Sequence, residues 1–261
     1  MTGVDTDARP ADTTLTPASA LRQTRQVSLR YFRVLLRQPA FMVITIVHPL
    51  IWLLLFGALF KGVTKIPGFS ADSYLDFLTP GIVVMLAVSS AGWTGMGFIE
   101  DINSGVMDRV LVTPAWRGAL NLGSVAQSVI SVLFQTALIV VLALIMGASL
   151  HNVPLLFLVA ALLAAAFASL SNGLGVLTRQ RESLIGAVSL LLLPLTFLSG
   201  ALMQLSLAPG WIRTVAKFNP VDWAVVGARD ADLLRLVLLG ALVVVAAWFA
   251  TSAFGVYQRS L

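Results

Sequence analysis

Few residues in this chain of 261 residues have the types and spacing that chemistry requires. The sequence contains no cysteine, which excludes disulfides and thiolate metal sites. Of the two histidines, His151 lies in a short polar turn, and His48 precedes Pro49 inside an apolar run with no acidic residue nearby. A histidine at bilayer depth can relay protons, but packing or pore lining is the favoured interpretation of His48, which has no acidic partner nearby in sequence. No serine, histidine and aspartate have the local context of a nucleophile elbow.

A nucleotide site is also missing from the sequence. Gly57 and Gly62 have the spacing of a phosphate-binding loop, but Val63 and Thr64 follow where Lys and Ser/Thr are required. We therefore expect no cofactor, metal or nucleotide to bind to this chain. The net charge of +5 does not indicate a nucleic-acid partner, because the positive residues flank long apolar runs.

A stripe of uncharged polar side chains marks the run 120–150. At helical spacing these residues fall within about 120° of one face. They should face other helices or a water-filled path rather than lipid, so interhelical hydrogen bonding and direct contact with a substrate both remain open. The stripe consists of Asn121, Ser124, Gln127, Ser128, Ser131 and Gln135.

Small residues crowd the run 77–99 around Trp93 and Met96. Small side chains let helices approach closely, and glycines soften a helix. Close packing alone explains this composition, and so does a flexible segment used in a conformational change. The small residues are Ser89, Ser90, Ala91, Gly92, Thr94, Gly95 and Gly97.

A polar loop between two apolar runs, residues 100–119, combines charges with apolar residues at helical spacing. Pro114 would end a short helix here. Such a helix can lie flat and present a surface to a partner, although an ordinary solvated loop has a similar composition.

The elements that position these residues follow from the apolar runs. The chain is 58% hydrophobic and only 11% charged, whereas about 25% charged residues is usual for a soluble domain. Runs of roughly 20 residues can cross about 30 Å of hydrocarbon. We predict an all-α polytopic membrane protein with six transmembrane helices. The predicted spans are residues 41–60, 77–99, 120–150, 155–177, 184–207 and 233–256.

The N-terminal residues indicate the orientation. Residues 1–17 have too little apolar content to fold alone, and we predict a disordered cytoplasmic tail. Residues 18–38 place arginines on one helical face and apolar residues on the other, which favours an amphipathic interface helix. By the positive-inside rule, both termini of the transmembrane domain, residues 39–261, are cytoplasmic and residues 207–235 are external.

Two segments resemble one family. The loop pattern of Met107–Pro114 is similar to that of the ABC-2 type permeases, the membrane subunits of certain ATP-binding-cassette exporters. Pro194–Trp211 resembles that family's signature, which Phe218-Asn-Pro220 and Arg229 continue. The chain looks most like the daunorubicin-resistance permeases of actinobacteria, with Gln204 standing where the family often has Pro.

The resemblance implies an assembly and a location. Two permease chains, identical or different, would form a path in the cell membrane. Two separate ATPase subunits would bind ATP and Mg and drive the transport. Residues 18–38 would connect to the first span at the membrane surface. The residues coupled to the ATPase would be Glu100, Asp101, Asp108, Arg109, Leu111, Thr113 and Pro114.

The resemblance also implies a pathway and a gate. A re-entrant segment between the fifth and sixth spans would form the external gate, and the second and fifth spans would line the route. Pathway residues would be Trp93, Met96, Gln127, Ser131, Phe197 and Met203. Gate residues would be Ser199, Gly200, Pro209, Trp211, Asn219 and Pro220.

Export of an amphipathic drug, antibiotic or lipid-like compound is the function that this resemblance favours. Export of a polysaccharide or glycolipid uses the same architecture. A membrane-embedded lipid-modifying enzyme would need clustered acidic residues and histidine near an interface, and only Glu100, Asp101 and Asp108 qualify. An autonomous channel or proton-coupled carrier would need ionisable groups inside spans, where His48 stands alone.

Overall fold

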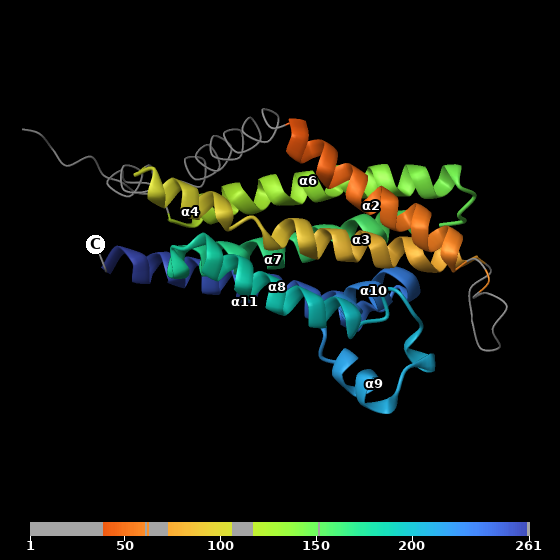
Figure 1. Cartoon of the computed structure of the whole chain (residues 1–261). Coiled ribbons are helices and arrows are strands. Elements are labelled where there is room, and N and C mark those ends of the chain that lie inside the picture. Colours follow the sequence, from red (N-terminus) through yellow and green to blue (C-terminus); the bar gives the residue numbers. More distant parts are fainter. Residues whose placement is uncertain (1–38, 61, 63–72, 106–116, 151, 260–261) are drawn as a thin grey trace, which may run out of the picture.

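The fold is seen in a computed structural model, which describes residues 39–60, 62, 73–105, 117–150 and 152–259. These residues form helices and turns, and no strand occurs among them. Figure 1 shows an elongated bundle whose long helices run side by side. The predicted tail and interface helix (residues 1–38), and residues 106–116, lie outside the described residues.

Within the described ranges, six long helices form the bundle, and shorter ones join them. The long helices are α2 (Pro39–Leu59), α3 (Tyr74–Gly92), α6 (Arg117–Ile145), α7 (Val153–Thr178), α8 (Arg181–Phe197) and α11 (Leu233–Arg259). The short elements are α4 (Met96–Asn103), the 3₁₀ helix η2 (Leu205–Leu207), α9 (Gly210–Ala216) and α10 (Pro220–Asp230).

Four of these segments are long and apolar enough to cross a membrane. They are Tyr74–Asn103, which joins α3 and α4, Asn121–Ile145, Val153–Thr178 and Leu233–Gly255. The described apolar part of α2 is the shorter segment Leu50–Leu59, and α8 has 17 residues. The all-helical, multi-span architecture is thus present, and the count of six spans stays a prediction.

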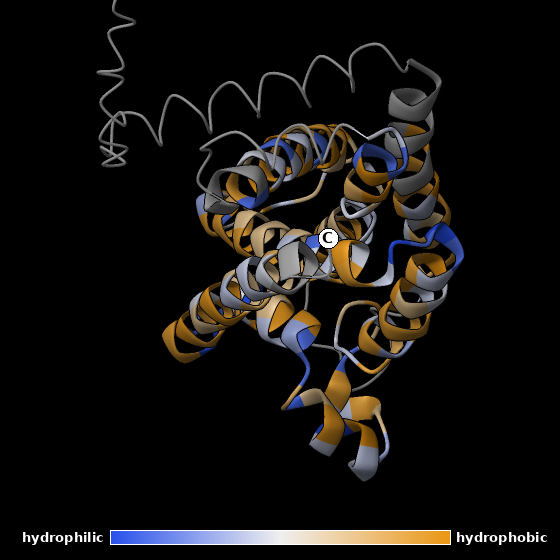
Figure 2. Ribbon diagram, turned by 90° about the vertical axis from the view of Figure 1, so that its left-hand side faces the viewer, coloured by the Kyte–Doolittle hydropathy of each residue, from blue (hydrophilic) through white to orange (hydrophobic). Residues whose placement is uncertain are grey.

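The outer sides of the helices are apolar. Leu55 on α2, Leu190 on α8 and Trp248 on α11 are all more than half exposed. Figure 2 shows hydrophobic residues along the outer faces of the bundle. A water-soluble bundle would carry polar residues there, so this distribution fits a lipid environment.

Helix α7 lies at the centre of the packing, against α11, α6 and α3. Its small residues allow this: a Cβ at Gly173 would lie 2.6 Å from the Phe249 ring and 3.2 Å from the Ala250 Cα of α11. The small-residue composition of the predicted fourth span therefore serves close helix packing.

Two helices end earlier than the predicted spans do. Helix α6 stops at Ile145 rather than continuing to residue 150, because Gly147 takes a positive φ of 91° and the chain turns there. Helix α8 stops at Phe197 rather than reaching residue 207. Both runs lack charges, so hydropathy alone does not reveal these ends.

Candidate functional site

The predicted second span is broken near its C-terminal end. Helix α3 ends at Gly92 and α4 begins at Met96, which leaves Trp93, Thr94 and Gly95 as a turn. The Ser171 hydroxyl of α7 accepts a hydrogen bond from the Gly95 amide at 3.0 Å and donates one to the Gly92 carbonyl. A serine of a neighbouring helix thus satisfies backbone groups that the break leaves without helical partners.

This break requires glycine for steric reasons. A Cβ on Gly95 would lie 2.1 Å from the Ser171 carbonyl oxygen, and one on Gly175 would lie 2.6 Å from the Gly95 carbonyl oxygen. The two backbones therefore touch at this crossing. The small residues were explained either by close packing or by a flexible segment. The structure shows close packing, and it occurs where the helix is interrupted.

Asn121, Ser124 and Ser128 of the polar stripe of α6 face neighbouring elements, which is one of the two environments predicted for the stripe. Asn172 of α7 donates to the Asn121 side-chain oxygen at 2.8 Å and accepts from Ser124 at 3.4 Å. Thr94, in the break, donates to Ser128 at 3.3 Å. We call Thr94, Asn121, Ser124, Ser128, Ser171 and Asn172 the polar seam. It ties the broken span to α6 and α7 through hydrogen bonds.

The predicted pathway residues do not gather at one place. Trp93 and Met96 pack against a small apolar cluster of Ile99, Leu184 and Val188. Gln127 and Ser131 hydrogen bond to each other along α6 at 3.1 Å. Phe197 lines an apolar hollow of about 270 Å³ between α2, α3 and α8, whereas Met203 is exposed in the loop beyond α8.

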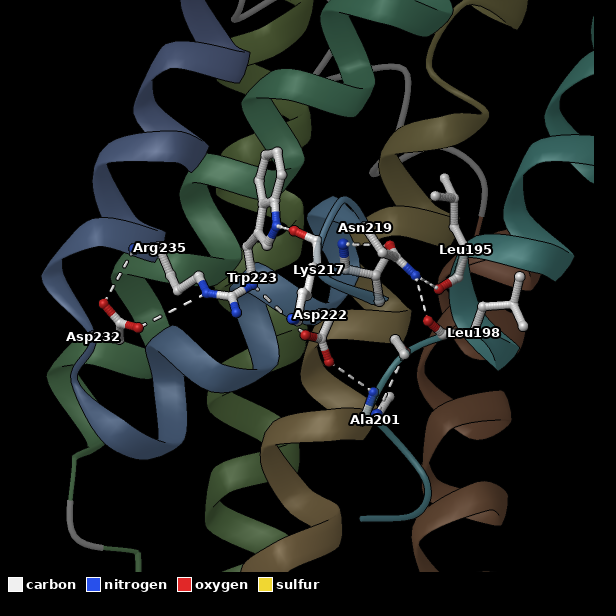
Figure 3. Close-up of polar contacts among 12 residues, drawn as sticks. Leu195, Leu198, Ala201, Lys217, Asn219, Asp222, Trp223, Asp232 and Arg235 are labelled. Atoms are coloured by element: carbon white, nitrogen blue, oxygen red, sulfur yellow. Dashed lines mark hydrogen bonds and ion pairs between the residues drawn. The ribbon is translucent and has the colours of Figure 1, made fainter. Parts of the chain in front are cut away.

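Asn219 joins two helix ends. Its side-chain oxygen accepts from the Val221 amide at 2.9 Å, which caps α10, and Pro220 occupies the first turn. Its amide nitrogen donates to the carbonyls of Leu195 and Leu198, at 2.7 and 3.0 Å (Figure 3). One buried side chain therefore starts α10 and satisfies the last carbonyls of α8.

Arg229 and Asp222 of α10 hold the chain that follows α8. Asp222 accepts from the Gly200 amide at 2.9 Å. Arg229 donates to the carbonyls of Gly200 at 2.8 Å, Ala201 at 3.3 Å and Phe77 at 2.6 Å. Its guanidinium also lies 3.7 Å from the centre of the Phe77 ring, at cation–π distance.

We call Asn219, Asp222 and Arg229 the α10 clamp. It fixes the chain after α8 to the start of α3, and Gly81 permits the close approach because a Cβ there would lie 2.0 Å from the Ala201 carbonyl oxygen. The clamp borders a hollow of about 520 Å³ that Asp76 and Gln204 also line.

The charges of the clamp are buried and balanced. Burial raises the pKa of Asp222 above its ordinary value, against the opposing effects of the Gly200 amide, Arg235 and Arg229. Burial lowers the pKa of Arg229 to about 10, against Asp230 and Asp222. Arg229 therefore stays protonated at neutral pH, and Arg235 adds an ion pair to Asp222 at 3.8 Å (Figure 3).

The predicted gate residues fall into two groups. Ser199, Gly200, Asn219 and Pro220 lie together at the clamp, where Ser199 donates to the Thr196 carbonyl at 2.6 Å. Pro209 and Trp211 lie away from it, at the start of α9, and Trp211 is exposed.

Two of the predicted coupling residues are described. Glu100 and Asp101 lie on α4, and Glu100 forms an exposed ion pair at 3.4 Å with Arg181, the first residue of α8. Asp108, Arg109, Leu111, Thr113 and Pro114 lie outside the described residues, as does His151.

Sequence reasoning did not assign three residues that the structure brings into these sites: Ser171, Asp222 and Arg229. The balanced charges of residues 213–235 were a usable signal, because charges in an otherwise apolar chain need partners. Ser171 gave no such signal, because a single serine within a run of small residues indicates only close helix packing.

The chain matches known proteins over most of its length. The family described as "ABC-2 type transporter" matches residues 22–233. The daunorubicin resistance ABC transporter permease protein DrrB1 of Streptomyces coeruleorubidus is 28% identical over 227 residues, which cover 85% of this chain and 77% of that protein. The inner membrane transport permease YadH of Escherichia coli is 26% identical over 231 residues, which cover 82% and 88%.

Proposed function

Because the chain belongs to the ABC-2 type transporter family, we propose that it is the permease subunit of an ATP-driven exporter. The family match over residues 22–233 carries this proposal, since it includes the broken span, the polar seam and the α10 clamp. The cargo we propose is an amphipathic drug, antibiotic or lipid-like compound. DrrB1, a similar protein, is named for daunorubicin resistance.

The proposed assembly contains two permease chains and two ATPase subunits, with ATP and Mg bound on the latter. The sequence has no phosphate-binding loop, so the driving force must come from another chain. We propose that the ATPase docks at the end of the bundle where Glu100 meets Arg181, against the loop that contains Asp108 and Arg109. Both termini are then cytoplasmic.

The proposed route runs along α3 and α8. The hollow between α2, α3 and α8 is lined by Trp52, Met85 and Phe197, and methionine and aromatic side chains adapt to apolar ligands of different shape. Leu190 and Leu193 of α8 are exposed beside it and would face the second permease chain. A dimer would convert this open surface into an enclosed path.

The proposed gate lies at the opposite end from the ATPase. Helix α8 has 17 residues and is therefore about 26 Å long, which is less than the roughly 30 Å of hydrocarbon that a span must cross. The chain after it would then begin below the membrane surface, as in the predicted re-entrant segment. The α10 clamp would hold this segment against α3.

Co-purification tests the proposal. We would express the chain with the ATP-binding chain encoded beside it, isolate the complex in detergent and measure ATP hydrolysis with and without daunorubicin. We expect a stable complex and hydrolysis that the drug stimulates. If no ATP-binding chain co-purifies, the chain is not the permease subunit of such an exporter. A complex that ignores daunorubicin but responds to a glycolipid would contradict the cargo alone.

A further inference from the structure

Helix α9 projects sideways from the bundle. Figure 1 shows it beside α10, apart from the long helices, and the end-on view of Figure 2 shows the same projection. Ala216 is the one buried residue of α9. The rest of this helix has no function in the α10 clamp or the polar seam.

One side of α9 exposes apolar residues. Trp211 is 62% exposed and Val215 is 42% exposed, and their spacing of four residues places them on one helical face. Phe218, just beyond the helix, is 77% exposed. Met203 and Leu207, just before it, are also exposed. This side of the projection therefore presents an apolar surface that no described element covers.

The other side of α9 is cationic. Arg213 and Lys217 are also four residues apart, and Arg213 lies about 200° around the helix from Trp211. Both are exposed, and neither forms an ion pair with a described residue. By contrast, two other arginines between α8 and α11 or at the start of α11 have partners in the fold: Arg229 donates to the Gly200 carbonyl and Arg235 forms an ion pair with Asp222. Arg213 and Lys217 thus remain available to an outside partner.

We propose that α9 is a lipid-binding interface helix. Trp211 and Val215 insert among the acyl chains at the α10 end of the bundle, and Arg213 and Lys217 bind lipid phosphate groups. An apolar face opposite a cationic one is typical of helices that lie in a bilayer interface, and tryptophan is enriched there. This inference rests on the chain spanning a membrane, and it does not depend on ATP or on the cargo.

The position of α9 favours lipid over a water-soluble partner. Phe197 at the end of α8 and Leu233 and Leu234 at the start of α11 are exposed apolar residues at the same end of the bundle. Their exposure indicates that hydrocarbon reaches this level. A helix that projects sideways here enters the headgroup region and does not extend into water.

Single-cysteine labelling tests the insertion. Since the chain has no cysteine, Val215→Cys and Lys217→Cys each provide a unique site for an environment-sensitive fluorophore on opposite faces of α9. The labelled full chain is reconstituted into phosphatidylcholine vesicles with or without phosphatidylglycerol. We expect lipids with a shallow nitroxide to quench the label at 215, and the neutral quencher acrylamide to reach the label at 217 several-fold better.

A second set of variants tests the phosphate contacts. Adding phosphatidylglycerol should increase the protection of the label at 215, and Arg213→Gln with Lys217→Gln should abolish this increase. Equal access of acrylamide to both positions would overturn the insertion. A label at 215 that is shielded without nitroxide quenching, together with disulfide-linked dimers when the unlabelled Val215→Cys protein is oxidised, would assign the surface to a second copy. An unchanged lipid response in the double variant would overturn the phosphate contacts.

Discussion

Arg229 connects segments that lie far apart in the sequence. Its three carbonyl partners belong to Phe77 at the start of α3 and to Gly200 and Ala201 after α8. Hydrogen bonds from a charged donor contribute about 1.5–3 kcal/mol each, and carbonyls left without partners add a further cost. The position of the proposed gate segment therefore depends strongly on this one side chain.

Replacing Arg229 should weaken the fold. We expect Arg229→Gln to lower the free energy of unfolding by about 2–4 kcal/mol, because it removes hydrogen bonds to buried carbonyls and a partner of buried Asp222. Thermal unfolding in detergent measures the effect. Arg213→Gln is the matched control, since Arg213 is exposed and unpaired among the described residues, and it should change the midpoint little. Equal midpoints for the two variants would contradict the role of the clamp.

Asp222 should make stability depend on pH in a defined direction. Because burial raises its pKa, the folded state binds a proton more readily than the unfolded state between the ordinary pKa of 3.8 and the raised one. The free energy of unfolding of the wild type should therefore increase, relative to Asp222→Asn, as the pH falls through the raised pKa. Chemical denaturation of both proteins over that range measures the difference. If the difference in free energy of unfolding between the two proteins decreases as the pH falls, the hydrogen bond and the nearby arginines, and not burial, determine the direction of the pKa shift of Asp222.

At the scale of single residues, the sequence revealed polar groups better than it revealed their partners. From its spacing, the stripe from Asn121 to Gln135 was predicted to face other helices or a water-filled path, and Asn121, Ser124 and Ser128 do bond to α7 or to the turn after α3. Arg229 was noticed as part of the family signature, but its hydrogen-bond partners among the described residues are backbone carbonyls. Any residue has a carbonyl, so the sequence cannot name these partners.

At the scale of elements, the break between α3 and α4 is the most unusual feature. A span that stops and restarts can bend there, and Ser171 supplies the hydrogen bonds that the break requires. The polar seam then connects this point to α6 and α7. If α3 or α4 moved relative to the other, the hydrogen bonds of Thr94, Gly95 and Gly92 to α6 and α7 would have to break and be replaced.

The crossing at Gly95 should not tolerate a methyl group. Because a Cβ at Gly95 would meet the Ser171 backbone at 2.1 Å, we expect Gly95→Ala to lower the free energy of unfolding by about 1–3 kcal/mol. Gly186→Ala is the matched control in α8, since a Cβ there meets nothing within 4 Å. It should be neutral or slightly stabilising, because alanine favours helix over glycine by about 1 kcal/mol. Thermal unfolding of the two variants should differ clearly, and an unaffected Gly95→Ala protein would contradict the tight crossing.

Hydropathy predicted where the helices occur better than where they end. The predicted second span of residues 77–99 runs from α3 into the first half of α4 without interruption, since no charge or proline marks the break at Trp93–Gly95. The predicted fifth span continued past Phe197 because residues 198–207 contain no charged residue. The observed C-terminal end of α8 depends on Asn219. Its side-chain amide donates hydrogen bonds to the last carbonyls of α8, although it lies more than twenty positions later in the sequence. Such long-range caps leave no local pattern.

At the scale of the whole molecule, the bundle contains two polar regions separated along its length. Asn121 lies near the start of α6 and Asn172 near the end of α7, so the break and polar seam lie toward the α4 end of the bundle, whereas the α10 clamp lies toward the opposite end. A partner that binds one end can shift the whole bundle only if it favours one arrangement of these elements over another. In our proposal, ATP binding supplies that preference through the loop that contains Asp108 and Arg109.

Charge reversal in this loop should separate transport from assembly. We expect Asp108→Lys or Arg109→Glu to reduce drug export strongly while leaving membrane insertion and protein level unchanged, because in our proposal this loop docks on the ATPase. Drug accumulation in cells that express both chains measures export. The same reversal at Asp7, in the predicted tail, should leave export intact. Normal transport by the loop variants would contradict the docking assignment.

Reconstitution tests the central claim most directly. Purified chain is placed in liposomes alone, with the ATPase partner, or with a partner unable to hydrolyse ATP, and daunorubicin movement is followed by fluorescence. We predict ATP-dependent movement with the active partner and none in the other two preparations. Movement of solute by this chain alone would contradict the conclusion that its driving force comes from another subunit.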